Sequence, residues 1–546
     1  MQPGSSICAR LVRSFALSAS FAVAAPAAAD EFEAFCWARH HPESTAHVTP
    51  LIQIDPWTNL EEASARLKEL PAGKRFIVFH SITDDMADHP LDRVVSRSWE
   101  IRTRQVPAPG STVAAPATAK ASASLVTASR GGPVSASQGR APGSASKLTS
   151  SPTPVPAAAA SRMITISERV PVDRLTEYRG PWMDNGIRTV RARVSALMQR
   201  LKSMGTPIDG IVLSNETTLH AACFMERVGA LAAIERDPRW PALAASMGLP
   251  AVVSDMWWGT EKYFLWTERM SGRFDAAMNQ AIFAPIRAAY PAAVVSNYCS
   301  GRQVRAFASP DVNGHLDRRQ TAGFGSHDNF EFYGWSAQRR LDVARGTQPA
   351  DEAWTVFRVE MHKIRGMNAS SSRPKHAWIA QRSWEGESYW PVRFESTPIW
   401  DELVLQLGMH GVRQFLELSI EDFSVSREAN LSRRAEDRAV LDGLLGELNE
   451  RVSGSSAGVL TAAQPSWNDR VIATGRRVGD RVVWRFSFAP GIDAVKVELQ
   501  DGSEATVTAE EGRRGAWFEH GADTGLVTDA SGRRLKMEVI ALSSNP

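Results

Sequence analysis

A pair of polar residues, Asn215 and Glu216, ends the stretch "IDGIVLSNE" at positions 208–216. A short apolar run between turn-forming residues is typical of a strand covered on both faces. In parallel α/β proteins, catalytic side chains lie at the carboxyl ends of such strands. A carboxyl group there can act as a general acid when its surroundings raise its pKa. The stretch therefore predicts a proton donor, provided that the rest of the chain supplies a matching sheet.

Polar and ionisable residues also follow the other strand-like stretches of the chain. They are Arg39, His40, His41, His80, Ser81, Asp84, Asp85, Glu168, Asn297, Tyr298, His327, Asp328, Gln381, Arg382, Trp384 and Glu417. Any one of them could be a surface residue or a hydrogen-bonded core residue. Because the active site of a parallel barrel is assembled from several strand ends, the set as a whole predicts one site.

Eight strand-like stretches must position these side chains. They are centred near residues 36, 77, 165, 211, 295, 323, 379 and 415, and helix-like stretches separate most of them. Eight strands with helical crossovers predict an α/β fold, a (β/α)8 barrel over residues 30–453. A doubly wound open sheet is the alternative, but no glycine-rich phosphate loop follows an early strand.

Two regions depart from this alternation. Residues 107–160 consist almost entirely of Ala, Ser, Pro, Gly and Thr. They cannot bury enough apolar surface to fold, so we expect a disordered insertion within the barrel domain. From about Gly454 onward, apolar and polar residues alternate between Gly and Asp turns, which predicts a β-sandwich domain over residues 454–546. We expect this domain to cover a flank of the barrel; glycan binding is the alternative role.

Residues 1–29 are typical of a secretory signal peptide. Arg10 and Arg13 precede an apolar run, and Ala27 and Ala29 fit a small-residue cleavage site. Cleavage after Ala29 predicts a secreted or periplasmic protein. No later stretch reaches the roughly 20 apolar residues of a membrane span, so we expect no membrane insertion. The net charge of +2 gives no field that would favour a nucleic acid.

Tryptophan is abundant, with 17 Trp against 6 Tyr. Several fall in predicted loops beyond strand ends: Trp257, Trp258, Trp384 and Trp390. The flat indole ring can pack against the C–H face of a sugar, and its N–H can bond a hydroxyl group. Ordinary core packing is the alternative for each of them. The candidate substrate contacts are Arg39, His80, Asn215, Trp258, Tyr298, His327, Gln381, Arg382 and Trp384.

An Asn-Glu pair that ends the fourth strand of an eight-stranded barrel resembles the clan A glycoside hydrolases. The resemblance implies that Glu216 is the general acid/base and that Asn215 contacts the sugar hydroxyl next to the anomeric carbon. In that clan, the nucleophilic Glu ends strand seven. This sequence departs from the pattern, because "HAWIAQRSWEGE" has Gln381 or Arg382 at that place. A glutamine cannot form the glycosyl ester.

Hydrolysis of a glycosidic bond still needs a second carboxylate. It lies about 5–5.5 Å from the acid in retaining enzymes and roughly 6.5–9.5 Å away in inverting ones. Glu385 or Glu387 could supply it from the loop after strand seven, and Glu417 from the end of strand eight. We favour Glu417 because it ends a predicted strand; capping of the next helix, or pairing with Arg413 or Arg382, is the alternative. The predicted function is hydrolysis of a poly- or oligosaccharide, with no cofactor.

Two other functions remain open on sequence grounds. A degenerate barrel could bind glycans without hydrolysing them, as the missing strand-seven Glu would allow. A metal-dependent hydrolase could draw ligands from His40, His41, His80, Asp84, Asp85 and His327. However, the first strand has no His-x-His pair, and adjacent side chains diverge on an extended strand. We therefore expect no metal ion.

Overall fold

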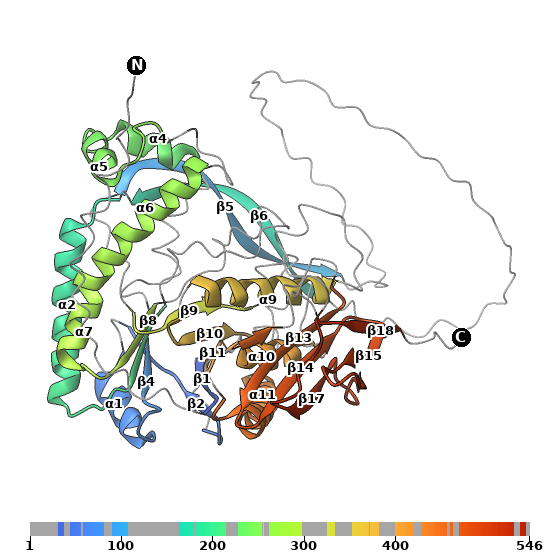
Figure 1. The fold of residues 1–546 in the computed structure, drawn as a ribbon. Coiled ribbons are helices and arrows are strands. Elements are labelled where there is room, and N and C mark those ends of the chain that lie inside the picture. Colours follow the sequence, from blue (N-terminus) through green and yellow to red (C-terminus); the bar gives the residue numbers. More distant parts are fainter. Residues whose placement is uncertain are drawn as a thin grey trace, which may run out of the picture. The chain divides into compact units, whose positions relative to one another are not determined.

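The computed structural model describes residues 31–37, 44–55, 58–80, 90–107, 163–179, 181–214, 228–253, 255, 261–297, 325–333, 352–370, 372–381, 399–418, 427–455, 459–461, 469–528 and 535–541 (Figure 1). The chain divides into two compact units. One comprises Met1–Val94 and Glu177–Pro546, and the other comprises Val95–Thr176.

Parallel strands of the larger unit form sheets of five and four strands. The five-stranded sheet has the order β2 (Val48–Pro50), β1 (Glu33–Trp37), β11 (Gln414–Leu418), β10 (Lys375–Ile379) and β9 (Asp328–Glu331). The four-stranded sheet has the order β3 (Ile52–Ile54), β4 (Phe76–His80), β7 (Gly210–Ser214) and β8 (Val294–Asn297). The predicted parallel α/β class is confirmed, and the described strands lie in two sheets rather than in one closed barrel.

Backbone hydrogen bonds connect these sheets at both edges. Only Leu51 separates β2 from β3, and its N–H donates to the carbonyl oxygen of Cys36 on β1 at 2.8 Å. At the other edge, the N–H of Ser326, just before β9, donates to the carbonyl oxygen of Val295 on β8 at 2.7 Å. The polar backbone of both edges is therefore satisfied at these points.

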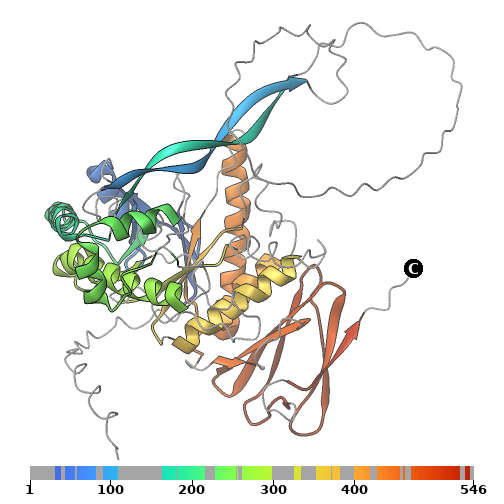
Figure 2. The same ribbon diagram turned by 90° about the horizontal axis from the view of Figure 1, so that it is seen from above.

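Helices lie between and beside the strands (Figures 1 and 2). They are α1 (Leu60–Glu69), α2 (Asp184–Ser203), α4 (Val228–Arg236), α5 (Trp240–Met247), α6 (Glu261–Met278), the π-helical turn η1 (Asn279–Phe283), α7 (Ala284–Ala289), α9 (Glu352–Ser370), α10 (Ile399–Met409) and α11 (Arg427–Val452). α1 shows the local logic: the side chain of Asn59 caps its first turn, which also carries Glu61 and Glu62. None of the described helices is both long and apolar enough to cross a bilayer.

The two faces of the sheets have different neighbours. On one face, Ala377 and Phe415 share an apolar core with α9, α10 and α11, while Ile77 and Ile211 share another with α1, α2 and α6. We call this the helix side. The opposite face, the inner face, carries a third core: Phe35, Leu51, Phe76, Val78, Val212, Tyr333, Trp378, Ala380 and Leu416. Since strand side chains alternate between faces, each strand residue can be assigned to one of them.

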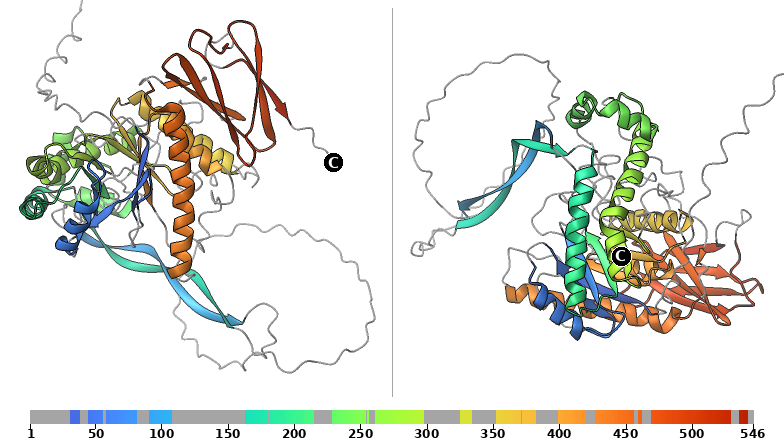
Figure 3. Two further views of the ribbon diagram at one scale, coloured as in Figure 1. Left: turned by 90° about the horizontal axis from the view of Figure 1, so that it is seen from below. Right: turned by 90° about the vertical axis from the view of Figure 1, so that its left-hand side faces the viewer.

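One of the predicted parallel strands is wrong. Residues 163–168 were expected to form the third barrel strand and to end on Glu168. They begin β6 (Met163–Arg179), which pairs with β5 (Pro90–Pro107) in a separate two-stranded sheet, seen as a long ribbon in Figure 3. The missing parallel strand is β2–β3, where Pro50 disguises the strand pattern. β1, β2, β3 and β4 precede β7 in chain order, so β7 is the fourth parallel strand when β2 and β3 are counted as one interrupted strand.

Antiparallel strands follow α11, as the sequence predicted for the C-terminal region. One sheet has the order β12 (Val459–Thr461), β13 (Val471–Val478), β14 (Arg481–Phe488) and β17 (Gly515–Gly521). The other has the order β16 (Glu504–Thr508), β15 (Ile492–Glu498) and β18 (Met537–Ala541). β13 and β14 are joined by the two-residue turn Gly479-Asp480, in which Gly479 has a φ of +59°.

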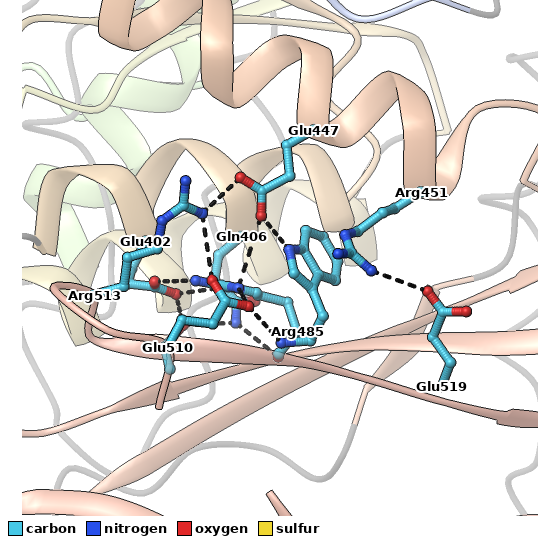
Figure 4. A network of polar contacts seen from close by, with 10 residues as sticks. Glu402, Gln406, Glu447, Arg451, Arg485, Glu510, Arg513 and Glu519 are labelled. Atoms are coloured by element: carbon cyan, nitrogen blue, oxygen red, sulfur yellow. Dashed lines mark hydrogen bonds and ion pairs between the residues drawn. The ribbon is translucent and has the colours of Figure 1, made fainter. Parts of the chain in front are cut away.

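A buried ion-pair network attaches these strands to α10 (Figure 4). The side chains of Arg485 on β14 and Glu402 on α10 are both 0% exposed and form a bidentate pair. Ser487 Oγ donates to Glu402 at 2.7 Å, and Arg485 also reaches Glu510 at 3.1 Å. The guanidinium of Arg485 lies 5.1 Å from the ring centre of Trp517. The C-terminal strands are thus held to α10 by paired charges as well as by apolar packing.

Candidate functional site

Aromatic and polar side chains gather at the carboxyl ends of the parallel strands. The indole rings of Trp37 on β1 and Trp378 on β10 meet edge to face, with centroids 5.7 Å apart. Trp37 Nε1 donates to Gln53 Oε1 at 2.9 Å, and Gln53 Nε2 donates to Asp55 Oδ2 at 3.0 Å. These four residues and Glu331 form what we call the strand-end group. It combines flat apolar rings with amide and carboxylate oxygens.

Glu331 is the last residue of β9 and was missed by the sequence analysis. Its Cα lies opposite that of Trp378 in the sheet register. Phe330 and Phe332 belong to the core on the helix side, whereas Tyr333 belongs to the inner core. By alternation, the side chain of Glu331 points to the inner face. The residue is 4% exposed, so the structure holds a buried carboxyl group on the strand next to that of Trp378.

A buried lysine supports β9 from the helix side. Lys363 Nζ on α9 donates to the carbonyl oxygen of Glu331 at 2.6 Å and lies 2.6 Å from the carboxylate of Glu360. The side chains of Lys363 and Glu360 are 1% and 0% exposed. The ammonium group is also 5.0 Å from the ring centre of Phe332. The end of β9 is therefore fixed by a charge-assisted hydrogen bond.

A chain of hydrogen bonds crosses the inner face nearer the amino ends of the strands. Asn329 Nδ2 donates to Ser296 Oγ at 2.8 Å, and Ser296 Oγ lies 2.8 Å from His376 Nδ1. His376 Nε2 donates to Gln414 Oε1 at 2.7 Å, and Gln414 Nε2 donates to Glu33 Oε1 at 2.8 Å. We call these five residues the inner-face chain. It links β8 of the four-stranded sheet to four strands of the other sheet, β9, β10, β11 and β1.

Burial sets the protonation of this chain. Burial lowers the pKa of His376 well below its ordinary value, and the nearby His327 adds to this shift. Burial raises the pKa of Glu33, while the hydrogen bond from Gln414 opposes the rise. His376 is therefore a neutral imidazole with its proton on Nε2, which is the form that accepts a hydrogen bond from Ser296.

Glu417, the favoured second carboxylate, lies on the helix side of β11. Phe415 belongs to the core shared with α11, whereas Leu416 belongs to the inner core. The thiol of Cys36 donates to Glu417, and Arg438 of α11 is among its charged neighbours. Burial raises the pKa of Glu417. The strand period of two thus turns this carboxyl group away from the strand-end group.

His327 lies at the opposite end of its strand from the expected one. The sequence placed it at the carboxyl end of a strand over 321–328, but β9 begins at Asp328. The His327 ring is instead 4.6 Å from that of His376, next to the inner-face chain. Burial lowers its pKa to about 4. It therefore does not join the strand-end group.

Two further candidates do lie at carboxyl ends. His80 is the last residue of β4, and its Cα lies opposite that of Ser214 on β7. Gln381 follows β10, and its buried Oε1 has no hydrogen-bond partner among the residues that the structure describes. Asn297 ends β8 and Asp328 begins β9, and both are buried. The remaining candidates fall outside the described residues: Arg39, His40, His41, Ser81, Asp84, Asp85, Asn215, Glu216, Trp257, Trp258, Tyr298, Arg382, Trp384, Glu385, Glu387 and Trp390. The described part of the chain contains no cluster of His, Cys, Asp or Glu that could hold a metal ion.

Comparison with known proteins gives distant structural neighbours. No family model and no curated protein matches this chain. A β-galactosidase from Rahnella sp. R3 is 13% identical, with a TM-score of 0.32 over 53% of this chain and 43% of that one. The β-galactosidase Gan42B from G. stearothermophilus is 12% identical, with a TM-score of 0.29 over 50% and 43%. A family 5 glycoside hydrolase from Bacteroides vulgatus is 12% identical, with a TM-score of 0.25 over 63% and 84%. This chain therefore spans less than half of the first two proteins, and we base its function on its own residues.

Proposed function

We propose that this protein is an exported glycoside hydrolase that acts on a poly- or oligosaccharide. In this proposal the two sheets close into a (β/α)8 barrel, with β2 and β3 as one interrupted strand. The hydrogen bonds of Leu51 and Ser326 at the two sheet edges support the closure. The parallel strands then follow in the order β1, β2–β3, β4, β7, β8, β9, β10 and β11, and β7 is the fourth.

The strand-end group is the observation that carries the proposal. Trp37 offers a partly exposed indole ring of the kind that packs against sugar C–H faces, and Trp378, which is 1% exposed, packs edge to face against it. Gln53, Asp55 and Glu331 add amide and carboxylate oxygens at the same ends of the strands. A few polar groups among aromatic side chains are typical of a small-molecule binding site.

The proposed general acid/base is Glu216, with Asn215 as a contact to a sugar hydroxyl. Glu216 comes two residues after the end of β7 in the sequence. Of the three other carboxylates that the sequence suggested, Glu417 faces α11, and Glu385 and Glu387, which follow β10 in the sequence, remain candidates.

Sugar release from a panel of polysaccharides tests the proposal. Mature protein beginning at residue 30 is incubated with each polymer, and new reducing ends are measured beside the Glu216→Gln variant. The wild type should release sugar, and the variant should lose about 10²–10⁴-fold of kcat/KM, as expected for a lost general acid. Binding of a glycan without any release would instead favour a degenerate binding barrel, which is consistent with Gln381 at the usual nucleophile position.

A further inference from the structure

We infer that Glu331 supplies the second carboxylate of this site and activates the attacking water. The inference rests on the proposed glycosidase function and goes beyond it, because it assigns the base to β9 rather than to the loop after β10 or to β11. Three features carry it: the strand end and face at which Glu331 lies, the support of β9 from the helix side, and the support of β9 from the inner face.

The first feature is position. Glu331 ends a parallel strand on the inner face, opposite Trp378 in register and two residues before Tyr333 of the inner core. Among strand residues that the structure describes, Glu33 and Glu417 are the other glutamates of the parallel strands. Glu33 begins β1, at the amino end of the sheet, and bonds Gln414; Glu417 bonds Cys36 on the helix side. Of these three described glutamates, Glu331 is the one that lies both at the carboxyl end of its strand and on the inner face.

The second feature is support from the helix side. Lys363 binds the carbonyl oxygen of Glu331 at 2.6 Å and is itself paired with Glu360 in a buried site. An ammonium group that is held by Glu360 and donates to this carbonyl oxygen restrains the last residue of β9. Catalytic side chains need this kind of support, because small misplacements cost rate. Lys363 and Glu360 are thus positioning residues for Glu331.

The third feature is support from the inner face. Asn329 occupies the same face of β9 as Glu331, one side-chain layer below it. Its amide donates to Ser296 Oγ, which contacts His376 Nδ1. Ser296 lies on β8 and His376 lies on β10. The hydrogen bonds of the inner-face chain therefore restrain the rotation of β9 about its own axis. Hydrogen bonds on both faces of β9 therefore hold the strand in place next to Glu331.

The reaction balances as a single displacement. The Glu331 carboxylate takes one proton from a water molecule while the water oxygen bonds to the anomeric carbon. The bond from that carbon to the leaving oxygen breaks, the electron pair goes to the oxygen, and Glu216 gives it a proton. The products are the two sugars, with Glu331 protonated and Glu216 ionised, and exchange with solvent restores both. The configuration at the anomeric carbon is inverted.

Two glutamate variants from opposite faces of the sheets test the assignment. Glu331→Gln keeps the side-chain shape, and it should lower kcat/KM for sugar release by about 10²–10⁴-fold while glycan binding and circular dichroism stay as in the wild type. Glu417→Gln is the matched variant on the helix side, and its sugar release should stay close to that of the wild type. The reverse pattern, with Glu417→Gln inactive and Glu331→Gln active, would overturn the inference.

Chemical rescue separates a catalytic role from a structural one. Sodium azide added to Glu331→Ala should restore turnover and yield a glycosyl azide of inverted configuration, because azide attacks without losing a proton. No rescue in a variant that still folds and binds glycan would refute the base role. A wild type that releases no sugar overturns the proposed function together with this inference, whereas an active wild type with an active Glu331→Gln overturns the inference alone.

Discussion

Replacing Arg485 by Met should weaken the attachment of the C-terminal strands to α10 more than any change of a surface charge. The variant leaves the carboxylate of Glu402 fully buried, with the hydroxyl group of Ser487 at 2.7 Å as its remaining hydrogen-bond donor among the described residues. Breaking a buried pair from one side costs about 3–5 kcal/mol, since the abandoned charge has lost its solvent and its partner. Burial raises the pKa of Glu402, and the charge of Arg485 opposes this rise.

Urea unfolding followed by tryptophan fluorescence measures this effect as a shift in the transition midpoint at constant slope. The double variant Arg485→Met/Glu402→Leu removes both charges and should regain most of the loss, because apolar replacements of a buried pair are often neutral or stabilising. Arg481→Met is the matched control, since Arg481 is 41% exposed in its pair with Glu519 and should cost less than about 1 kcal/mol. A loss below about 1 kcal/mol for Arg485→Met, or no recovery in the double variant, would refute the reasoning.

Two further changes test the supports of the site. Lys363→Met removes the cation beside the buried Glu360 carboxylate and should lower the free energy of unfolding by about 3–5 kcal/mol in urea titrations. A variant with the same free energy of unfolding as the wild type would contradict a stabilising role for this buried pair. His327 has a pKa lowered to about 4 by burial, so the unfolded chain binds a proton below pH 6.5 that the folded chain accepts only near pH 4. Stability is therefore lost as pH falls through this window, and at pH 5 the His327→Asn variant should escape about 1–2 kcal/mol of that loss. An unchanged pH profile would count against a neutral His327 in the folded chain.

The parallel strands were predictable where turn residues enclose a clear apolar run. β7 lies within the predicted stretch, and β4, β8, β10 and β11 fall near their expected centres. β2 and β3 were missed because Pro50 and Gln53 interrupt the apolar pattern of residues 48–54. In addition, β2 belongs to one sheet and β3 to the other. β6 was misassigned because local strand propensity does not say which strand it pairs with; that choice depends on contacts far away in sequence.

The errors in the site follow from strand boundaries and from strand periodicity. We predicted that the sixth strand ends near His327, but β9 begins at Asp328 and ends at Glu331. The residues of its amino end were therefore taken for those of its carboxyl end. The signal that could have corrected this was the alternation in "DNFEFY", where Asn329 and Glu331 share one face and two phenylalanines share the other. For Glu417, the same alternation around Phe415 and Leu416 decides the face, but sequence alone does not say which face meets the helices.

Proton NMR of the products from a susceptible polysaccharide tests the central claim most directly. The wild-type protein should give new anomeric signals, with the first-formed product inverted relative to the substrate linkage. Absence of any new anomeric signal across the polysaccharide panel, from folded mature protein, would contradict the assignment of this chain as a glycoside hydrolase.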